Sequence, residues 1–302
     1  MNKNILITLL FMLTILFTAC TTDNGIKESI LDKTTIDKIK ELEKENNILI
    51  NYCDIPIEDD IVGEYALATD KKEIEEAVEA ADIILERLPK DWAITISNPE
   101  VIADENEKIE QIQLVFCDYV KTDDGDNIKG SFYYRKNNTI CYLIDIHNYE
   151  PKISISETLV YRMVQKKNMD EEIEILIMGD DGNKALREKN SIVRRFTSYN
   201  PEGFEYYNNI EEIKDEDKKY LYTNDDNINN IYFVNEEALY SEYNDLIQTI
   251  SPLLYTDNLD DLPKVYQSEN IKNKSISALL SINAIFPNGV EHLKEWYDVL
   301  GS

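Results

Sequence analysis

The hydrophobic residues of this 302-residue chain change their spacing twice, and these changes divide the sequence into helical, β and helical parts. Apolar positions between residues 69 and 92 follow a helical period. The period then becomes two, which predicts four strands at 92–96, 110–120, 131–135 and 139–146. Helical spacing returns after residue 150. The sequence therefore predicts an α+β fold, a small and mostly antiparallel sheet followed by a helical half.

Two helices are expected before the sheet. The first covers residues 35–47 and leads into the apolar segment 48–52. The second starts at Thr69 or Asp70, either of which can cap it, and ends at Pro89. The links after the second and third strands, 121–130 and 136–138, are rich in turn residues, so the last three strands are expected to form an antiparallel meander. The acidic residues of the first link lack calcium-loop spacing and indicate a turn: Asp123, Asp124 and Asp126.

The first twenty residues indicate export. Lys3 precedes an apolar run from Ile5 to Phe17, which is short for a membrane span, and small residues lead to Cys20. The segment resembles a bacterial lipoprotein signal peptide, so we expect residues 1–19 to be removed and Cys20 to be lipidated. An uncleaved anchor and a plain secretory signal are the alternatives. Residues 20–33 are expected to form a flexible tether, and no later stretch is long and apolar enough to span a bilayer.

The formal net charge of −28 excludes nucleic acid and anionic lipid as partners, because both would be repelled. Residues 34–302 suit a single domain, with a sheet-containing part at 34–150 and a helical part at 151–302. We expect a monomer tethered to an extracytoplasmic bacterial membrane face through its N-terminal lipid.

Three further cysteines, Cys53, Cys117 and Cys141, are an odd number without a CxxC pair. Cys117 and Cys141 both fall in expected strands, so an exported protein could join them in a disulfide. Buried free thiols are the alternative that we favour.

A helix is expected over Ile153–Asp170, with Ser154 and Glu157 as a capping box at its start. Its apolar stripe is Leu159, Val160, Met163 and Val164, which leaves Thr158, Tyr161, Arg162 and Gln165 on the other faces. A helical or loop region follows to about residue 198.

The rest of the chain contains a turn at Asn200–Gly203 and a strand-like segment at 231–234. Asn235 is expected to cap a helix that runs to about Ile250. Two more helices, 273–287 and 289–300, close the chain.

Five segments of the chain carry a resemblance through their order and spacing. They are ILERLPKDW (84–92), SISETLVYRMVQ (154–165), SYNPEGFEYY (198–207), NIYFVNEEALYSEYNDL (230–246) and SISALLSINAIFP (275–287). In this order they resemble a family of zinc metallopeptidases found as exported lipoproteins in low-GC bacteria. The resemblance covers most of residues 40–300 and implies a zincin-like fold.

The resemblance also implies where a metal site would lie. An HExxH helix places two histidines on one zinc, its glutamate acts as the general base, and a downstream carboxylate completes the site. Tyr161 aligns with the first histidine, Arg162 with the glutamate and Gln165 with the second histidine. Asp245 aligns with the downstream ligand.

These substitutions predict that the site holds no metal. The phenol of Tyr161 keeps its proton up to about pH 10, the neutral oxygen of Gln165 suits harder cations than zinc, and Arg162 cannot accept a proton. We therefore expect no metal, no cofactor and no catalytic residue. If the geometry survives, Arg162 and Asp245 can pair directly. The alternative is an ordinary amphipathic helix, on which these polar groups only pack or are solvated.

The leading hypothesis is a catalytically inactive, metallopeptidase-like lipoprotein (a pseudo-peptidase) that binds a peptide or protein in a retained cleft. The first alternative is a structural or antigenic surface lipoprotein without a cleft function. The second is an active hydrolase with an unrecognised site, which would require His147 and His292, the only two histidines, to converge with carboxylates.

Overall fold

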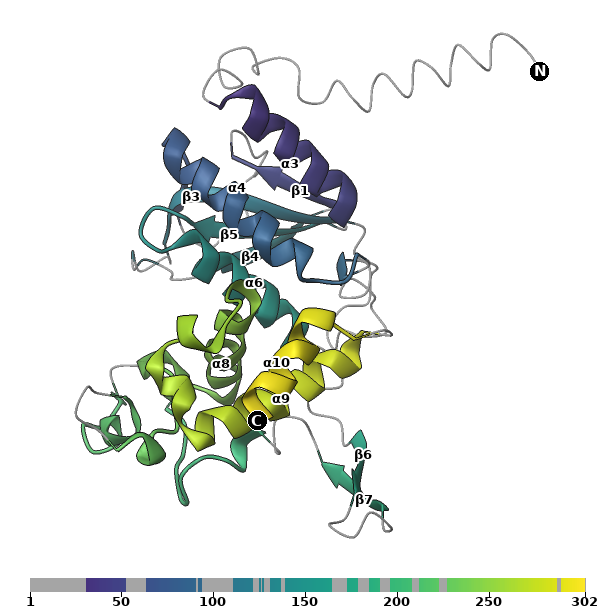
Figure 1. The fold of residues 1–302 in the computed structure, drawn as a ribbon. Helices are drawn as coiled ribbons and strands as arrows, with labels where there is room; N and C mark the ends of the chain where they lie inside the picture. The colour runs from purple at the N-terminus through teal and green to yellow at the C-terminus, as the bar shows by residue number, and fades with distance from the viewer. Residues whose placement is uncertain are drawn as a thin grey trace.

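The computed structural model describes residues 31–52, 64–90, 92–93, 111–121, 125, 127, 131–136, 139–164, 173–178, 185–190, 196–207, 212–222, 227–286 and 289–301. The expected signal peptide, Cys20, Cys53, Gln165 and the three aspartates of the acidic turn lie outside these residues. Figure 1 shows a sheet with helices on one face in one half of the molecule and a group of helices in the other. Among the helices that the structure describes, none has the length and apolar character needed to cross a bilayer.

Both N-terminal helices are present as predicted, but the expectation that they precede the sheet is wrong, because two of its strands lie between them in the chain. Helix α3 (Lys33–Asn46) follows Asp32, whose carboxylate accepts a hydrogen bond from the Thr35 amide. Helix α4 (Lys71–Glu86) is capped by Asp70, which accepts from the amides of its first turn. Thr69 instead bonds to Asp118 of the sheet. The apolar stripe of α4 is buried: Ile74, Ala77, Val78, Ala81, Ile84 and Leu85.

The sheet has five strands: β1 (Ile48–Asn51), β2 (Glu64–Leu67), β3 (Gln111–Lys121), β4 (Ser131–Lys136) and β5 (Thr139–Asp145). Their order is β1-β3-β5-β4, and β2 pairs with β3 beyond the end of β1. β1, β3 and β5 are parallel, whereas β2 and β4 are antiparallel to their neighbours. The sheet is therefore mixed rather than mostly antiparallel.

The predicted meander is wrong in its order. β4 and β5 do form an antiparallel hairpin, but β5 lies between β4 and β3 and runs parallel to β3. The physical reason is burial: every described side chain from Ile140 to Ile144 is buried, as in a central strand covered on both faces. The expected strand at 92–96 is also wrong at Trp92 and Ala93, the two of its residues that the structure describes. Trp92 lies in a helical turn, and its amide donates to Pro89.

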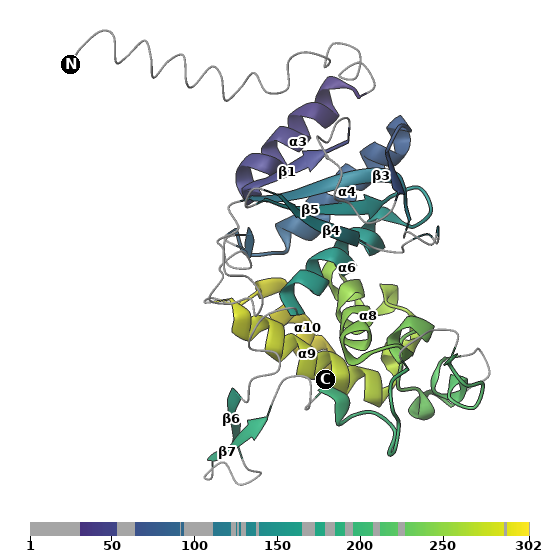
Figure 2. The ribbon, with the colours of Figure 1, turned by 180° about the vertical axis from the view of Figure 1, so that it is seen from behind.

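Alternate residues of β3 and β5 face opposite sides of the sheet. Leu114, Phe116 and Tyr142 face the side covered by α3 and α4 and belong to the main core. Val115, Cys117 and Leu143 form a smaller cluster on the other side, the one turned to the viewer in Figure 2.

The two described cysteines are buried free thiols, which confirms the favoured alternative. Cys117 pairs in register with Asp145, and Cys141 with Gln113, so the thiols are offset by four residues. This offset corresponds to about 13 Å along a strand, beyond the reach of a disulfide. Burial also raises the pKa of the Cys117 thiol to about 12, which makes it unreactive.

Helix α6 (Pro151–Val164) leads from the sheet into the helical half. It begins three residues before Ser154, so the predicted capping box is wrong. The Ser154 hydroxyl donates to the carbonyl of Asp145 at the end of β5, and Glu157 bonds to another helix. An antiparallel hairpin of β6 (Ile173–Met178) and β7 (Ala185–Asn190) follows, where a helical or loop region was expected.

Residues 196–239 contain the predicted turn, in which Gly203 has φ 76°. Within the described residues, the segment 231–234 pairs through a single isolated bridge, from Leu221 to Phe233, so it is not a strand. Asn235 caps a 3₁₀ helix, η4 (Glu236–Leu239), rather than the long helix expected there. The other 3₁₀ helices are η2 (Lys218–Tyr220), η3 (Ile228–Asn230), η5 (Leu259–Asp261) and η6 (Lys264–Gln267).

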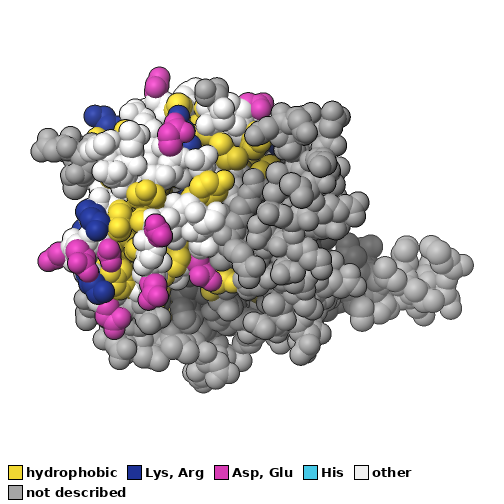
Figure 3. Space-filling view, turned by 90° about the horizontal axis from the view of Figure 1, so that it is seen from below, with side chains coloured by type: hydrophobic (Ala, Val, Ile, Leu, Met, Phe, Trp, Pro, Cys, Tyr) yellow, Lys and Arg dark blue, Asp and Glu magenta, His cyan; other side chains and the backbone are white. Residues whose placement is uncertain are grey.

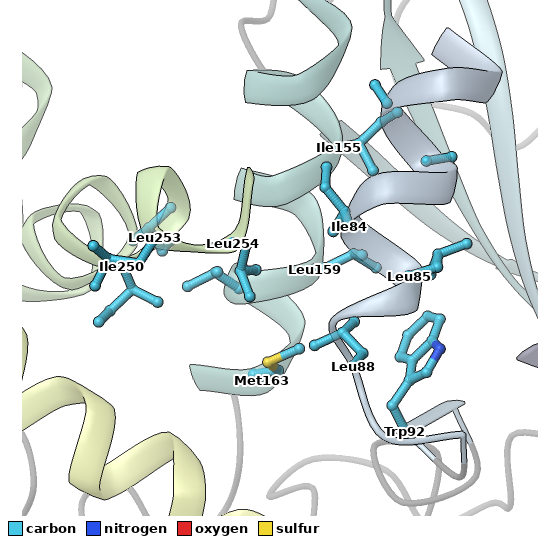
Figure 4. Packing of buried hydrophobic residues seen from close by; sticks show 14 of the residues in the cluster. Ile84, Leu85, Leu88, Trp92, Ile155, Leu159, Met163, Ile250, Leu253 and Leu254 are labelled. Atoms are coloured by element: carbon cyan, nitrogen blue, oxygen red, sulfur yellow. The ribbon is translucent and has the colours of Figure 1, made fainter. Parts of the chain in front are cut away.

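Helix α8 (Glu242–Tyr255), capped by Ser241, packs against α6, and α9 (Glu269–Ile285) and α10 (Glu291–Gly301) follow as predicted. Figure 4 shows α6 between α4 and α8. The apolar side chains that fill these contacts are Ile84, Leu85 and Leu88 from α4 and its end, Ile155, Leu159 and Met163 from α6, and Ile250, Leu253 and Leu254 from α8.

Proline at position 252 interrupts the hydrogen-bond ladder of α8, because proline has no amide hydrogen to donate. Side chains from other elements bond to the carbonyls of this region. The Tyr266 hydroxyl donates to the Thr249 carbonyl at 2.7 Å, and the Trp296 indole donates to the Leu253 carbonyl at 2.9 Å. Arg87, after α4, donates to the carbonyl of Leu254 and forms an ion pair with Asp257. These contacts tie α8 to α10 and to the sheet half.

Candidate functional site

Three of the positions that the resemblance assigned to a metal site, Tyr161, Arg162 and Asp245, lie on α6 and α8, which pack together, and Gln165 lies outside the described residues. Arg162 is buried on α6 with 3% of its surface exposed, and Tyr161 is half-buried beside it. Asp245 is completely buried on α8, one turn after the Ser241 cap. In a metal site on these two helices, the carboxylate of Asp245 would have to be accessible to the metal ion.

The carboxylate of Asp245 is not accessible to a metal ion, because it forms an ion pair with Lys274 of α9. The Lys274 ammonium lies 2.6 Å from Asp245 Oδ2, and both side chains have 0% exposure. The expected pairing of Arg162 with Asp245 is therefore wrong: within the described residues, the cation that contacts Asp245 is Lys274. The charge balance that was anticipated is present, but a third helix supplies it.

The remaining groups around this ion pair complete a buried polar cluster. Tyr206 donates its hydroxyl to Asp245 Oδ2 at 2.8 Å and accepts from the Asn200 amide at 2.8 Å. Lys274 also donates to the Tyr232 carbonyl at 2.8 Å, and its ammonium lies 3.9 Å from the centroid of the Phe233 ring. The ammonium therefore has a carboxylate, a carbonyl and an aromatic face as partners.

This cluster joins the segments that carried the family resemblance. Asn200 and Tyr206 belong to SYNPEGFEYY, Tyr232 and Phe233 to the YFV segment, and Asp245 to EYNDL. Lys274 immediately precedes SISALL. Residues from the segments 200–206, 232–245 and Lys274 therefore build one buried contact rather than several separate sites.

Sequence reasoning missed Lys274, although a signal was present. The buried apolar residues of α9 include Ile271, Ala278 and Ile282, and Lys274 falls on the same stripe at helical spacing. A lysine on an apolar stripe is a candidate for a buried charge with a dedicated partner. The sequence alone could not show that Lys274 and Tyr206 both contact Asp245, because these contacts depend on the fold.

Burial sets the electrostatics of the pair. It raises the pKa of Asp245, and the nearby Lys274 ammonium opposes that rise. It lowers the pKa of Lys274, and the charge of Asp245 opposes that fall. Burial and the charge of Asp245 together raise the pKa of the Tyr206 hydroxyl well above its usual value, so it remains a donor. In each group burial opposes the charged form, and the charge of the partner is the largest contribution that favours it.

These residues do not fit a zinc ion. A dication beside Asp245 would meet the Lys274 ammonium at 2.6 Å, and Tyr161 and Arg162 are poor ligands for the reasons given above. Across the described ranges, no three His, Cys, Asp or Glu side chains come together in a group that could hold a metal ion.

A second polar cluster lies next along α8, at Gln248. Its amide nitrogen donates to Glu157 of α6 at 2.9 Å and to Glu237 of η4 at 3.1 Å, and its oxygen accepts from Asn235 at 2.7 Å. One neutral side chain therefore bridges two carboxylates from different elements. This arrangement fixes α6, α8 and η4 in one geometry.

The two histidines lie in different halves of the molecule and do not form a joint site. His147, just after β5, bonds to Glu73 of α4 at 2.9 Å. His292 of α10 lies 2.9 Å from the Leu253 carbonyl and stacks edge-on against Trp296. The hydrolase alternative that depended on their convergence is therefore not supported.

Two cavities border these regions. One of about 460 Å³ lies beside His147, at the ends of β3 and β5, and its walls include Asp118 and Glu73. The other, of about 360 Å³, lies at the Asn200–Gly203 turn and has Tyr206 in its wall. The second cavity is thus separated from the Asp245–Lys274 pair by one hydrogen-bonded side chain.

No family model matches the chain, and no curated protein matches it. The chain is similar to a solved structure of a putative zinc-binding metallo-peptidase from Bacteroides caccae ATCC 43185, with 12% sequence identity over 88% of this chain and 92% of that chain and a TM-score of 0.46. A likeness at this level assigns no residue roles.

The first prediction concerns the buried pair. Substituting either member alone, as Lys274→Met or Asp245→Asn, should lower the free energy of unfolding by about 3–5 kcal/mol, because the other ion is left buried without its partner. Urea denaturation measures this loss. The control Lys272→Met, two residues earlier on α9, breaks a more exposed pair with Glu269 and should cost less than about 1 kcal/mol.

The pH dependence of the two losses should be opposite. In Lys274→Met the pKa of Asp245 rises further above its unfolded value, so the variant is most stable at acid pH and loses stability as the pH rises through that pKa. In Asp245→Asn the pKa of Lys274 falls further below its unfolded value, so stability is lost as the pH falls through it. Parallel trends between pH 5 and pH 8.5 would contradict a direct ion pair.

The second prediction concerns the two histidines, which should titrate on opposite sides of the usual pKa of about 6.5. The hydrogen bond and charge of Glu73 raise the pKa of His147, whereas burial and the charge of Arg87 lower the pKa of His292. Proton NMR of the imidazole resonances measures both values. Glu73→Gln should return His147 toward 6.5 without moving His292; equal shifts at both sites would rule out the pairing.

Proposed function

We propose that this chain is an exported, membrane-tethered lipoprotein with a metallopeptidase-like fold that binds a peptide or protein and does not hydrolyse it. The proposal combines the lipoprotein-like start of the chain with the polar interior of the helical half. It also uses the cavity beside Tyr206, which gives a ligand a place to lie.

The observation that carries the proposal is the ion pair of Asp245 with Lys274. Metal-dependent peptide hydrolysis needs a cluster of ligands around the metal and a base beside the metal-bound water. At this position the carboxylate is fully buried, its charge is already compensated by an ammonium, and a tyrosine hydroxyl bonds to the same oxygen. The neighbouring positions hold a phenol and a guanidinium. This chemistry favours a stable pocket wall over a catalytic centre.

The cavity also supports binding over a purely structural role. A surface lipoprotein whose only role is to be displayed would need no concave site. The cavity beside Tyr206 has the size of small-ligand pockets and lies next to the buried cluster, which holds its wall in place. We therefore favour binding over the structural alternative.

The third prediction tests the loss of hydrolytic chemistry. After incubation with zinc and removal of unbound metal, the purified chain should retain far less than one zinc per molecule, and it should not cleave an unfolded general protease substrate. Elemental analysis and a fluorescent casein assay measure the two properties. One bound zinc per chain that disappears in Asp245→Ala, together with cleavage, would overturn the proposal.

The fourth prediction tests the lipid anchor. In bacteria that express the full chain with labelled palmitate, the wild-type protein should carry label and sediment with membranes. Cys20→Ala should lose the label and remain unprocessed, because the cysteine is both the lipid acceptor and the first mature residue. Cys53→Ala is the matched control and should behave as the wild type. Undiminished labelling of Cys20→Ala would exclude the anchor.

A further inference from the structure

The cavity at the Asn200–Gly203 turn combines aromatic walls with an excess of acidic side chains. It has a volume of about 360 Å³ and is formed by two segments, 202–207 and 212–220. The aromatic residues are Phe204, Tyr206, Tyr207 and Tyr220, and the charged ones are Glu202, Glu205, Glu212, Lys214, Glu216 and Asp217. The wall of this cavity thus contains five carboxylates and one lysine.

The aromatic walls are fixed by their contacts in the interior. The Gly203 turn directs the chain so that Phe204 packs against Phe233, with ring centroids 4.6 Å apart, and edge-on against Tyr206 and Tyr220. The hydroxyl of Tyr206 donates a hydrogen bond to the buried carboxylate of Asp245, which fixes the position of the ring. These rings therefore offer a preformed surface that loses little conformational entropy when a ligand binds.

Most of the carboxylates are available to a ligand. Asp217 accepts the Tyr207 hydroxyl, but in the part of the chain that the structure describes, no hydrogen bond or ion pair engages Glu202, Glu205, Glu212 or Glu216. The lysine that follows the cavity, Lys218, pairs instead with Asp215 and Glu236, and Lys219 lies over the Tyr220 ring. Figure 3, which views the molecule from below, shows acidic side chains and some basic ones around hydrophobic side chains on the left of the described surface.

We propose that this cavity binds the cationic side chain of a lysine or arginine in a polypeptide ligand. This inference rests on the proposed peptide-binding function and names the chemistry of the ligand. An ammonium or guanidinium can lie on an aromatic face while it donates to neighbouring carboxylates, and both interactions are strongest where the walls are preformed. The negative charge of the whole chain adds long-range attraction for such a ligand and repels anions.

Metal ions are a poorer match for the same walls. The described residues include no group of three or more carboxylate, thiol or imidazole side chains that could hold a metal ion. The other aromatic rings in the wall meet Phe204 edge-on, and their apolar edges can contact the methylene stem of a lysine or arginine. The cavity therefore suits an organic cation on a chain better than an inorganic one.

The test measures binding of acetyl-Gly-Arg-Gly-amide to the full chain in nonionic detergent by isothermal titration calorimetry. Its neutral counterpart contains citrulline, which preserves the shape of arginine without the charge. The arginine peptide should bind and the citrulline peptide should bind at least about tenfold more weakly, since each nearby unit charge contributes about fivefold even in water at ~4 Å.

Paired variants separate a local site from general attraction to an acidic protein. Glu202→Gln/Glu205→Gln removes two cavity charges and should weaken binding of the arginine peptide about tenfold or more. Glu41→Gln/Glu79→Gln removes two exposed charges from α3 and α4, far from the cavity in sequence, and should change affinity less than about twofold. Both variants should keep the wild-type unfolding midpoint, because all four side chains are exposed.

Each outcome gives a decision. Equal losses in the two variants, or equal binding of the citrulline peptide, would overturn the cavity assignment and indicate non-specific attraction. Binding of neutral peptides that neither variant weakens would leave the peptide-binding function in place and remove only the inference about charge. Zinc-dependent cleavage of the arginine peptide would overturn the proposed function itself, whatever the cavity binds.

Discussion

The helical half of the protein is organised around one buried ion pair, Asp245 with Lys274. The pair lies where α8 and α9 meet, and its other partners come from the Asn200–Tyr206 turn and from the extended segment at Tyr232. Two charges in a dry interior are stable only while every partner is present. The pair therefore fixes the relative placement of segments that share few regular backbone hydrogen bonds with one another.

The contrast between Arg162 and Lys274 shows how the same charge balance can arise from different positions. Arg162 is buried on α6, which packs against α8, but it is a lysine on α9 that reaches the carboxylate. A lysine offers a compact point charge on a flexible stem, and this ammonium reaches the acid, a carbonyl and an aromatic face together. Next to it, Gln248 links Glu157 and Glu237 through a neutral amide. α8 thus presents a charged and an uncharged polar contact on successive turns.

Much of the local structure could be predicted from the sequence, because it depends on short-range rules. The stripe of α4, the Asp70 cap and the two last helices follow from spacing and cap chemistry. The order of the strands could not be predicted in this way. β5 lies inside the sheet because its side chains are buried on both faces, and this burial depends on how the layers assemble. The partner of Asp245 could not be predicted either. Its cation is 29 residues away, and only the packing of α8 on α9 selects Lys274 over Arg162.

The buried pair also has a consequence for how sequences of this kind can diverge. A lineage that replaces Asp245 or Lys274 alone passes through a less stable chain, because one charge is left without compensation. The two residues should therefore be inherited together or exchanged together. A stepwise path that frees Asp245 for a metal would therefore begin with a loss of stability before any catalytic gain.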